Sequence, residues 1–311
     1  MANEDVTGGD DPRESSRQKA VAEGLQRIIH RAFDNGSTGQ KIKNFLNGTW
    51  MGHPLHVILT DVPIGAWTAA EVFDVLEVAS GSDGCGKAAD TSIAIGIFGA
   101  LGAALTGATD WQDADAPARR IGMIHGLLNL GGAALFTTSW FMRKRGSRTM
   151  GRLLSALAYA GMTYSARLGG NMVYDYRVGV DRTAGQSFPE DFVAVLSESE
   201  LSEDTPTRVE HEGVPILLVK RQNRIFALAE TCSHFSGPLS EGKLISNSIQ
   251  CPWHRSRFAL EDGRVLDGPA VHPQPCLETR VHNGQIEIRN RPGRQAQPLT
   301  APEVGGLRPV A

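Results

Sequence analysis

The chain has 311 residues, of which 41% are hydrophobic and 21% charged, and its formal net charge is −3. This length is enough for two domains, and the slightly acidic balance argues against a nucleic-acid-binding protein, whose affinity comes mostly from a basic surface. Four cysteines are too few for a disulfide-stapled scaffold. The charge is unevenly spread, because residues 91–109 carry none and residues 121–142 carry only the titratable His125. This pattern indicates that part of the chain lies in a membrane.

Residues 1–47 form a polar N-terminal region with one predicted amphipathic helix. The first residues are acidic and lack an apolar stretch, so we expect no secretory signal peptide there. Val21, Leu25 and Ile28 then recur at helical spacing, with basic residues on the other faces. This helix is expected either to pack on the protein surface or to lie in the lipid interface. Residues 1–16 and the tail 291–311 are expected to be unstructured.

A membrane domain of four helices is predicted over residues 48–182. The second and third hydrophobic segments are uninterrupted, and roughly 20 apolar residues are enough to cross the hydrocarbon core of a bilayer. The connections are short, so neighbouring helices should run antiparallel. The fold class is therefore multidomain, with an N-terminal all-α four-helix transmembrane bundle. The four helices are expected at about 54–78, 88–109, 121–142 and 153–174.

After a linker at 183–190 the sequence no longer contains long hydrophobic segments. Residues 191–290 alternate short β-rich runs with turn signals such as the Asp262-Gly263 pair. This alternation predicts a small all-β domain of about 100 residues.

Two short motifs in this β domain carry the strongest chemical signal. Cys232 and His234 are separated by one residue, and Cys251 and His254 by two. Thiolates and imidazoles paired in this way predict a metal site. A zinc finger groups its cysteines in one pair and its histidines in the other, whereas each loop here supplies one of each. A [2Fe–2S] cluster with two cysteines on one iron and two histidines on the other uses this arrangement, and zinc remains the alternative.

These motifs resemble those of Rieske iron–sulfur domains, over about residues 190–290. The resemblance extends to Ser256 and Phe258 and to the loop containing Pro269. It implies that Cys232, His234, Cys251 and His254 hold the cluster, and that Ser256, Phe258, Trp253 and Pro269 tune it.

The departures from the respiratory Rieske pattern favour the ferredoxin-like branch. Gly237 and Trp253 stand where respiratory members carry a disulfide, and Phe258 lacks the hydroxyl of a tyrosine. Fewer hydrogen bonds to the sulfurs predict a low to intermediate potential. Arg255 replaces a usual glycine, and with Arg257 it is a candidate for docking an acidic partner, the alternative being that both belong to a solvated rim.

The helical part resembles a family of four-helix membrane domains of unknown function, found fused to Rieske domains. Its motifs include the segments around His53 and His56, around His125, and at 168–180, which contains Asn171. Polar residues in membrane segments are functional candidates. His56 and His125, with His53 and Asn171 nearby, are therefore a possible site for haem b or a quinone, the alternative being capping or headgroup contacts. We expect this domain to be a redox partner of the cluster.

The sequence therefore predicts a membrane-anchored electron carrier, or an oxidoreductase component, rather than a complete enzyme. It would pass single electrons between a reductase or quinol pool and an unknown acceptor, with a redox protein or quinone as partner. A non-catalytic redox sensor and a quinol-oxidising respiratory subunit are the alternatives. An oxygenase subunit is disfavoured because only 21 residues follow residue 290. We expect a multi-pass protein of the cell membrane with the Rieske domain in the cytoplasm, where clusters are inserted, since no twin-arginine signal opens the chain.

Overall fold

The computed structural model describes residues 15–33 and 36–291. Most of the two stretches expected to be unstructured lies outside the described residues. The chain divides into two compact units. The helical unit combines the first described helix with Leu55–Val178, and the cluster unit combines Asn35–Pro54 with the chain from Gly179 onward.

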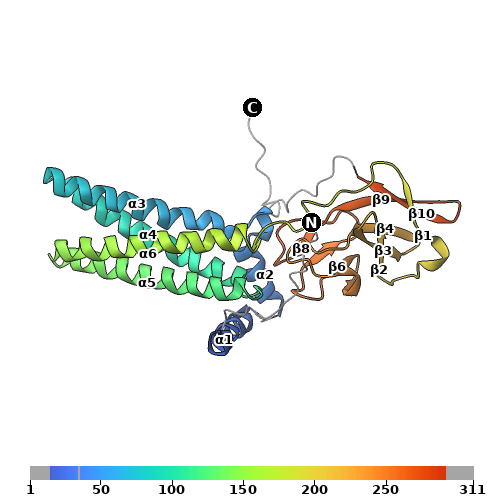
Figure 1. Ribbon diagram of the computed structural model, residues 1–311, viewed down its shortest axis with the longest axis horizontal. Coiled ribbons are helices and arrows are strands. Elements are labelled where there is room, and N and C mark those ends of the chain that lie inside the picture. Colours follow the sequence, from blue (N-terminus) through green and yellow to red (C-terminus); the bar gives the residue numbers. More distant parts are fainter. Residues whose placement is uncertain (1–14, 34–35, 292–311) are drawn as a thin grey trace. The chain divides into compact units, whose positions relative to one another are not determined.

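The number of helices is not matched, because the described residues ahead of the β domain contain six α-helices, whereas four membrane helices and one amphipathic helix were expected (Figure 1). The segment Gly36–Asn47 was not predicted as a helix, yet it forms one that belongs to the cluster unit. The helices are α1 (Ser16–Phe33), α2 (Gly36–Asn47), α3 (Leu55–Ser80), α4 (Asp83–Trp111), α5 (Ala118–Lys144) and α6 (Arg148–Tyr174).

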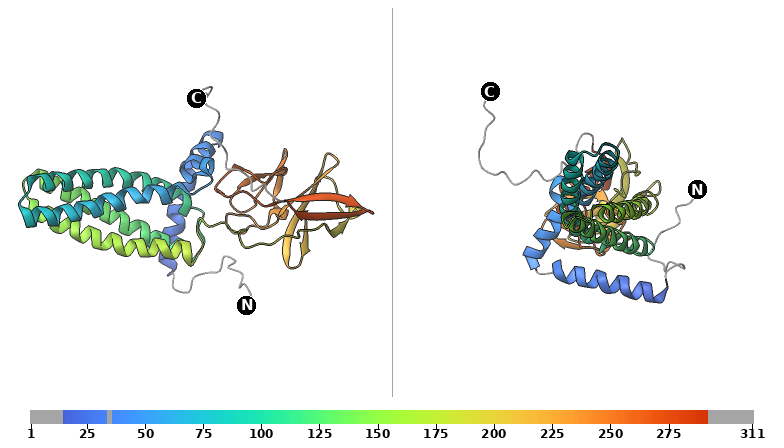
Figure 2. Two further views of the ribbon diagram at one scale, coloured as in Figure 1. Left: turned by 90° about the horizontal axis from the view of Figure 1, so that it is seen from above. Right: turned by 90° about the vertical axis from the view of Figure 1, so that its left-hand side faces the viewer.

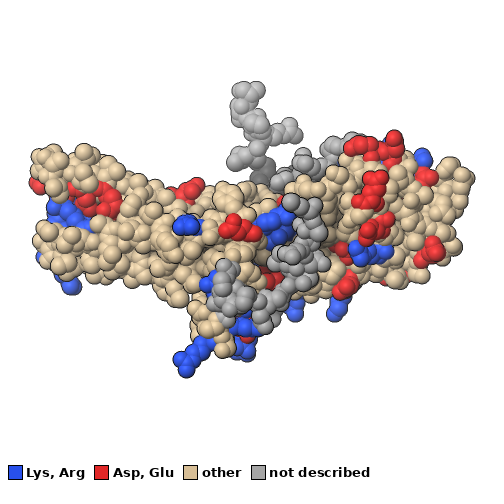
Figure 3. Space-filling view, in the orientation of Figure 1, with Lys and Arg blue, Asp and Glu red and all other residues tan. Residues whose placement is uncertain are grey.

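Helices α3 to α6 run side by side as a bundle, which both views of Figure 2 show. Two of them, α4 and α5, are long and apolar enough to cross a membrane. Helices α3 and α6 contain several charged residues, which lowers their hydropathy. On the face drawn in Figure 3, red and blue side chains gather at the left-hand end of the bundle and are sparse over its middle.

The centre of the bundle is built from one aromatic stack and small residues. The rings of Trp67 and Phe136 lie 4.1 Å apart between centroids and nearly parallel, and Trp67 Nε1 donates to the carbonyl of Ile93. A side chain on Gly96 would clash with the Trp67 ring, so the glycine lets α4 approach α3 closely.

A buried ion-pair network closes the end of the bundle formed by the α3–α4 and α5–α6 connections. The Arg143 guanidinium is buried and donates to both carboxylate oxygens of Asp74, at 2.6 and 2.5 Å, and to the hydroxyls of Ser139 and Ser155. Further ion pairs join Arg148 to Glu77 and Asp90, Arg152 to Glu77, and Lys144 to Asp90. The network therefore pairs acidic residues of α3 and α4 with basic residues of α5 and α6.

Helix α1 packs across the connection between α4 and α5. Its Gln26 side chain is buried and donates to the carbonyls of Trp111 and Ala114 at 3.0 and 2.9 Å. Val21 and Ile28 of the same helix are exposed. Helix α1 therefore has a packed face and an outward apolar face, and its place in the lipid interface stays a prediction.

The β domain of the cluster unit consists of two antiparallel sheets. The larger has the strand order β1-β10-β9-β4-β3-β2 and the smaller has the order β5-β6-β7-β8. Strand β3 is buried on both faces, so its residues alternate between two cores, with Leu217 in the core that contains both motif cysteines. The strands are β1 (Val193–Ser197), β2 (Thr207–His211), β3 (Val214–Arg221), β4 (Arg224–Ala229), β5 (Lys243–Ile245), β6 (Ser248–Gln250), β7 (Arg257–Ala259), β8 (Val265–Asp267), β9 (Cys276–His282) and β10 (Gln285–Asn290).

Candidate metal centre

Three loops of the cluster unit build the site. The first, 230–238, follows β4 and carries Cys232 and His234, and the second, 251–256, joins β6 to β7 and carries Cys251 and His254. The third, 268–275, follows β8 and is called the Pro loop here, after Pro269. Strand pairing within the small sheet fixes the second loop, and the first loop leaves the large sheet, so residues from both sheets meet at one place.

The two cysteine sulfurs are buried next to each other. Their hydrogen bond and burial raise the pKa of Cys232 well above its usual value. The same hydrogen bond, helped by the backbone N–H groups of Trp253 and His254, lowers the pKa of Cys251 to about 7. The N–H groups of His234 and Phe235 donate to the Cys232 sulfur. Backbone donors therefore surround both sulfurs and stabilise negative charge on them.

The two imidazoles form the other side of the site. The ring centroids of His234 and His254 lie 5.2 Å apart, and both rings are half-buried. Nδ1 of His234 is shielded from solvent and has no hydrogen-bond partner among the described residues. Burial, followed by the neighbouring His254 and Lys43, lowers the pKa of His234 well below its usual value. The neutral imidazole with an open nitrogen is the form that binds a metal.

These residues fit a [2Fe–2S] cluster. In the described ranges, no three or more His, Cys, Asp or Glu side chains converge as a group that would hold one ion. The four motif side chains meet instead as a thiol pair and an imidazole pair. A side chain on Gly237 would stand 2.7 Å from the Cys251 sulfur, so the glycine keeps room beside the thiols. The orphaned nitrogen of His234 is an open ligand atom beside the imidazole of His254.

The residues predicted to tune the cluster lie around it in different ways. Ser256 is fully buried, and its Oγ accepts the N–H of Ala270 in the Pro loop at 2.9 Å, which leaves the hydroxyl proton to be donated. Phe258 is buried in the core that contains both cysteines. Pro269 is buried in the Pro loop, whereas Trp253 is exposed next to His254.

Gln274 was missed from the sequence, although it holds two of the loops together. Its buried side chain donates to the carbonyls of Ala229 and Thr231 and accepts the N–H of Ser233, which lies between the first two ligands. Gly263 stands opposite, with φ +71° and the carbonyl of Gln274 where a side chain would be. A glutamine in a loop carries no sequence signal of such a role.

Helix α2 was also missed as part of this site. Asn44 accepts the N–H of Gly268 at 2.9 Å and donates to Asp267, and Thr49 donates to the carbonyl of Ala270 at 3.4 Å. These contacts cover the Pro loop with residues some 220 positions earlier in the chain.

The two arginines proposed for partner docking differ in their surroundings. Arg257 forms an ion pair with Asp267, with Nη2 2.6 Å from the carboxylate, so its charge is largely balanced. Arg255 is exposed and has φ +64°, a left-handed conformation that glycine adopts without strain. The glycine usual at this position in Rieske domains therefore has a physical reason, and the arginine takes the same backbone conformation.

The predicted membrane-side residues divide between the two units. His53 lies in the cluster unit, with Nδ1 3.4 Å from the carbonyl of Pro54. His56 and His125 lie in the helical unit and are held alike, with Nδ1 2.9 Å from the carbonyls of Ala103 and Ser165 respectively. Asn171 lies near the end of α6, where its carbonyl accepts the N–H of residue 175.

The expectation of haem b finds no support. The Nδ1–H of His125 donates to the carbonyl of Ser165, which leaves Nε2 as the acceptor of a hydrogen bond from Asn129 at 3.1 Å. The nitrogen that would bind a haem iron is thus already engaged. Glycines at 107 and 169 make room for the two imidazole rings, which a packed structural histidine needs as well.

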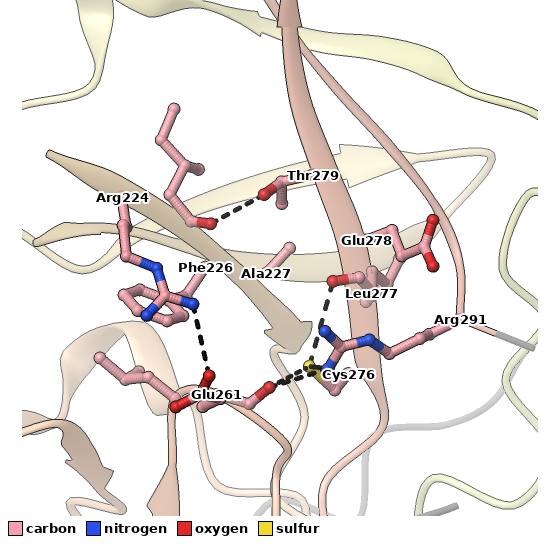
Figure 4. A pocket seen from close by; sticks show the side chains of 11 residues that line it. Arg224, Phe226, Ala227, Glu261, Cys276, Leu277, Glu278, Thr279 and Arg291 are labelled. Carbon is pink, nitrogen blue, oxygen red and sulfur yellow. Dashed lines mark hydrogen bonds and ion pairs between the residues drawn. The ribbon is translucent and has the colours of Figure 1, made fainter. Parts of the chain in front are cut away.

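A separate pocket of about 390 Å³ lies on the large sheet and contains none of the motif residues (Figure 4). The thiol of Cys276 lies at its edge and donates to the carbonyl of Glu261 at 3.5 Å. Figure 4 shows Arg224 reaching toward Glu261 across the pocket. The pocket is lined by residues of the sheet strands and their neighbouring loops, and we assign it no role.

Comparison with known proteins agrees with this geometry in both units. Residues 191–279 match the family described as the Rieske [2Fe-2S] domain, and residues 52–182 match a family described as predicted membrane protein (DUF2231). The Rieske domain implies a [2Fe–2S] cluster.

The relatives and the solved structure named here match about a third of this chain. The 3-phenylpropionate/cinnamic acid dioxygenase ferredoxin subunit of Photorhabdus laumondii is 33% identical over 95 residues, which are 30% of this chain and 90% of that protein. Human apoptosis-inducing factor 3 is 28% identical over 103 residues, and the match spans only 17% of its length and 32% of this chain. The ferredoxin of carbazole 1,9a-dioxygenase from Nocardioides aromaticivorans is 25% identical, with a TM-score of 0.31 over 33% of this chain and all of that one. The chain therefore belongs to the Rieske [2Fe–2S] family, with a predicted membrane protein domain fused ahead of the Rieske domain.

Proposed function

We propose that the chain is a membrane-anchored Rieske electron carrier that passes single electrons between a reductase or quinol pool and an acceptor. The observation that carries the proposal is the pairing of two buried thiols with two half-buried imidazoles. When bound, a [2Fe–2S] cluster supplies a one-electron redox couple. The ferredoxin-subunit relative, which is itself a component and not a whole enzyme by its name, supports a carrier role.

In this proposal Cys232 and Cys251 hold one iron, and His234 and His254 hold the other. The buried cysteine side keeps water from the sulfurs, while the half-buried histidine side is open to a partner. Electrons therefore enter and leave next to the imidazoles. Trp253, exposed beside His254, is part of the same surface.

We also propose that α3 to α6 cross the membrane together and that the Rieske domain lies in the cytoplasm. Large apolar side chains are exposed on all four helices, where a soluble bundle would bury them. At one end of the bundle, Asp74 of α3 pairs with Arg143 of α5. Glu77 of α3 pairs with Arg148 and Arg152 of α6. The exposed apolar residues include Val75, Phe98, Leu101, Leu105, Leu127, Leu130, Leu153 and Leu157. Protease added to spheroplasts should leave the Rieske domain intact, and its digestion there would reverse the orientation.

The carrier role is tested on the purified full chain in detergent or nanodiscs. After reduction with dithionite it should show a Rieske-type EPR signal, and His234→Ala should abolish that signal. A redox titration then separates the alternatives, because a low to intermediate potential fits a ferredoxin-like carrier and a high potential fits a quinol-oxidising subunit. Slow, non-catalytic reoxidation by every membrane acceptor would favour a redox sensor.

A second candidate function makes the helical unit a quinone-type partner of the cluster. The symmetrical anchoring of His56 and His125 through Nδ1 favours it, because a histidine fixed in this way presents its other nitrogen to a neighbour. For His125 that neighbour is Asn129, which leaves His56 as the candidate. Replacing α3 to α6 by an unrelated membrane anchor should slow oxidation of the pre-reduced cluster by a quinone, and equal rates would leave the helices as an anchor only.

A further inference from the structure

Helix α2 and the short helix η1 (Thr49–Met51) turn polar side chains inward and apolar side chains outward. Lys43 and Asn47 are 9% and 2% exposed, whereas Ile42 and Phe45 are 47% and 58% exposed. A helix on a soluble domain normally buries its apolar stripe and leaves its charged face in water. The reversed pattern leaves an apolar surface open on the cluster unit.

The inward face of α2 is fastened to the loop that carries Pro269. Asn44 accepts from Gly268 and donates to Asp267, and Thr49 donates to Ala270. The fit is close, because a side chain on Gly268 would stand 2.6 Å from the Thr49 hydroxyl. Ala270 in turn donates to Ser256 beside the cluster ligands. Whatever binds the outward face of α2 therefore also fixes the position of the cluster site.

The outward face has the composition of a lipid-contacting surface. The rings of Phe45 and Trp50 stack at 6.0 Å between centroids, and Trp50 Nε1 donates to the carbonyl of Phe45 at 3.2 Å. Aromatic residues with their polar atoms satisfied are typical of the membrane–water interface. Lys41, which is also exposed, suits an anionic headgroup layer.

Two further observations point to a bilayer as the occupant. Only residues 52–54 separate η1 from α3, the first helix of the proposed membrane bundle, so this face is continuous in the chain with the lipid-facing segments. Helix α1 shows the same reversal, with Gln26 buried and Val21 and Ile28 55% and 65% exposed. Two successive helices before the bundle thus offer apolar residues to a surface outside the described chain.

We propose that Ile42, Phe45 and Trp50 form a membrane-contacting face by which the cluster unit rests on the lipid surface. This inference rests on the membrane location in the proposed function. It restricts how the cluster site is oriented relative to the bilayer, so partners reach His234 and His254 from a limited set of directions.

The test uses the full chain in bilayers of phosphatidylethanolamine and phosphatidylglycerol that contain a lipid with a photoactivatable diazirine. Peptides covering residues 42–50 should be labelled along with those of α4 and α5, and Ile42→Glu with Phe45→Glu should lose the first label at least tenfold while keeping the second. Val281→Glu, at an exposed apolar residue of β9, should change neither label.

The outcomes separate this inference from the proposed function. Label on α4 and α5 with none on 42–50 overturns the membrane-contacting face alone, as do cross-links that join residues 42–50 of two chains. Absence of label on α4 and α5 overturns the membrane location itself. A second measurement records the cluster EPR of aligned bilayers at different angles to the field. The wild type should depend on the angle, and Phe45→Ser, a milder change, should weaken that dependence at full signal intensity; an unchanged dependence contradicts the proposal.

Discussion

The Arg143 side chain of the helical unit and the motif side chains of the cluster unit differ in whether their buried polar atoms have hydrogen-bond partners. In the helical unit, the Arg143 guanidinium is satisfied by Asp74, Ser139 and Ser155, so its charge needs nothing from outside the protein. In the cluster unit, Nδ1 of His234 is buried with no partner among the described residues, and two thiols lie against each other. Satisfied groups stabilise a fold, whereas an open buried nitrogen beside paired thiols indicates a missing ligand. The contrast separates a structural polar cluster from a functional one.

Removing a motif ligand should have the largest effect and should stay within the cluster unit. Cys251→Ser should abolish cluster binding, since a hydroxyl is a poor replacement for a thiolate on iron. The measurement is the visible and EPR spectrum of the reduced full chain, with iron counted per chain. Cys276→Ser, which changes a cysteine outside the motifs, is the matched control and should keep the full spectrum; loss of the spectrum in the control alone would contradict the ligand assignment.

Arg143→Met should destabilise the helical unit and spare the cluster. Removing one partner of a buried ion pair leaves the carboxylate of Asp74 uncompensated, which costs about 3–5 kcal/mol. Resistance of the full chain to unfolding in mixed micelles with sodium dodecyl sulfate measures the loss. Arg145→Met, at an exposed position two residues on, should have little effect. Equal losses in both variants would mean that the network does not hold the bundle together.

Ser256→Ala should lower the reduction potential without removing the cluster. The hydroxyl proton of Ser256 is available to the reduced, more negative site, and hydrogen bonds to charged groups are worth about 1.5–3 kcal/mol. The expected change is roughly a tenfold fall in the equilibrium constant for reduction, which is about 59 mV for one electron. Ser248→Ala, at another buried serine whose hydroxyl donates to Ile245, serves as control. An unchanged potential in Ser256→Ala would remove this residue from the tuning set.

Arg255→Gly should have the smallest effect and the opposite sign. The left-handed backbone at this residue costs a residue with a side chain about 1 kcal/mol relative to glycine. The variant should lose its cluster absorbance at a higher temperature than the wild type. Arg255→Ala removes the same charge but keeps the backbone strain, so a rise in both variants would assign the effect to charge instead.

The cluster motif could be predicted because the ligands of each pair lie close together in the sequence. Each ligand pair lies within four residues, and the residue types alone specify the chemistry. Gln274 and Asn44 could not be predicted in the same way, because their roles depend on carbonyls and N–H groups far away in the chain. In the sequence, a polar residue in a loop looks the same whether or not its side chain forms hydrogen bonds to a distant loop.

In the helical unit, the apolar segments predicted where helices lie, whereas the pairing of the charged side chains could not be predicted. Uninterrupted stretches gave the positions of α4 and α5, which are the two candidate spans. Asp74 and Arg143 are 69 positions apart, so their pairing follows only from the packing of α3 against its neighbours. Helix α2 was not predicted, and its burial pattern is opposite to that of a helix on a soluble domain, with Lys43 and Asn47 buried and Ile42 and Phe45 exposed.

The most direct test of the account is the metal content and iron environment of the wild-type chain. Purified with its membrane domain, the protein should contain two irons and two acid-labile sulfides per chain, as a [2Fe–2S] cluster requires. Mössbauer spectra of the reduced form should resolve two unlike irons, one held by Cys232 and Cys251 and the other by His234 and His254. A single zinc ion, or iron without sulfide, would contradict the assignment on which the proposed function depends.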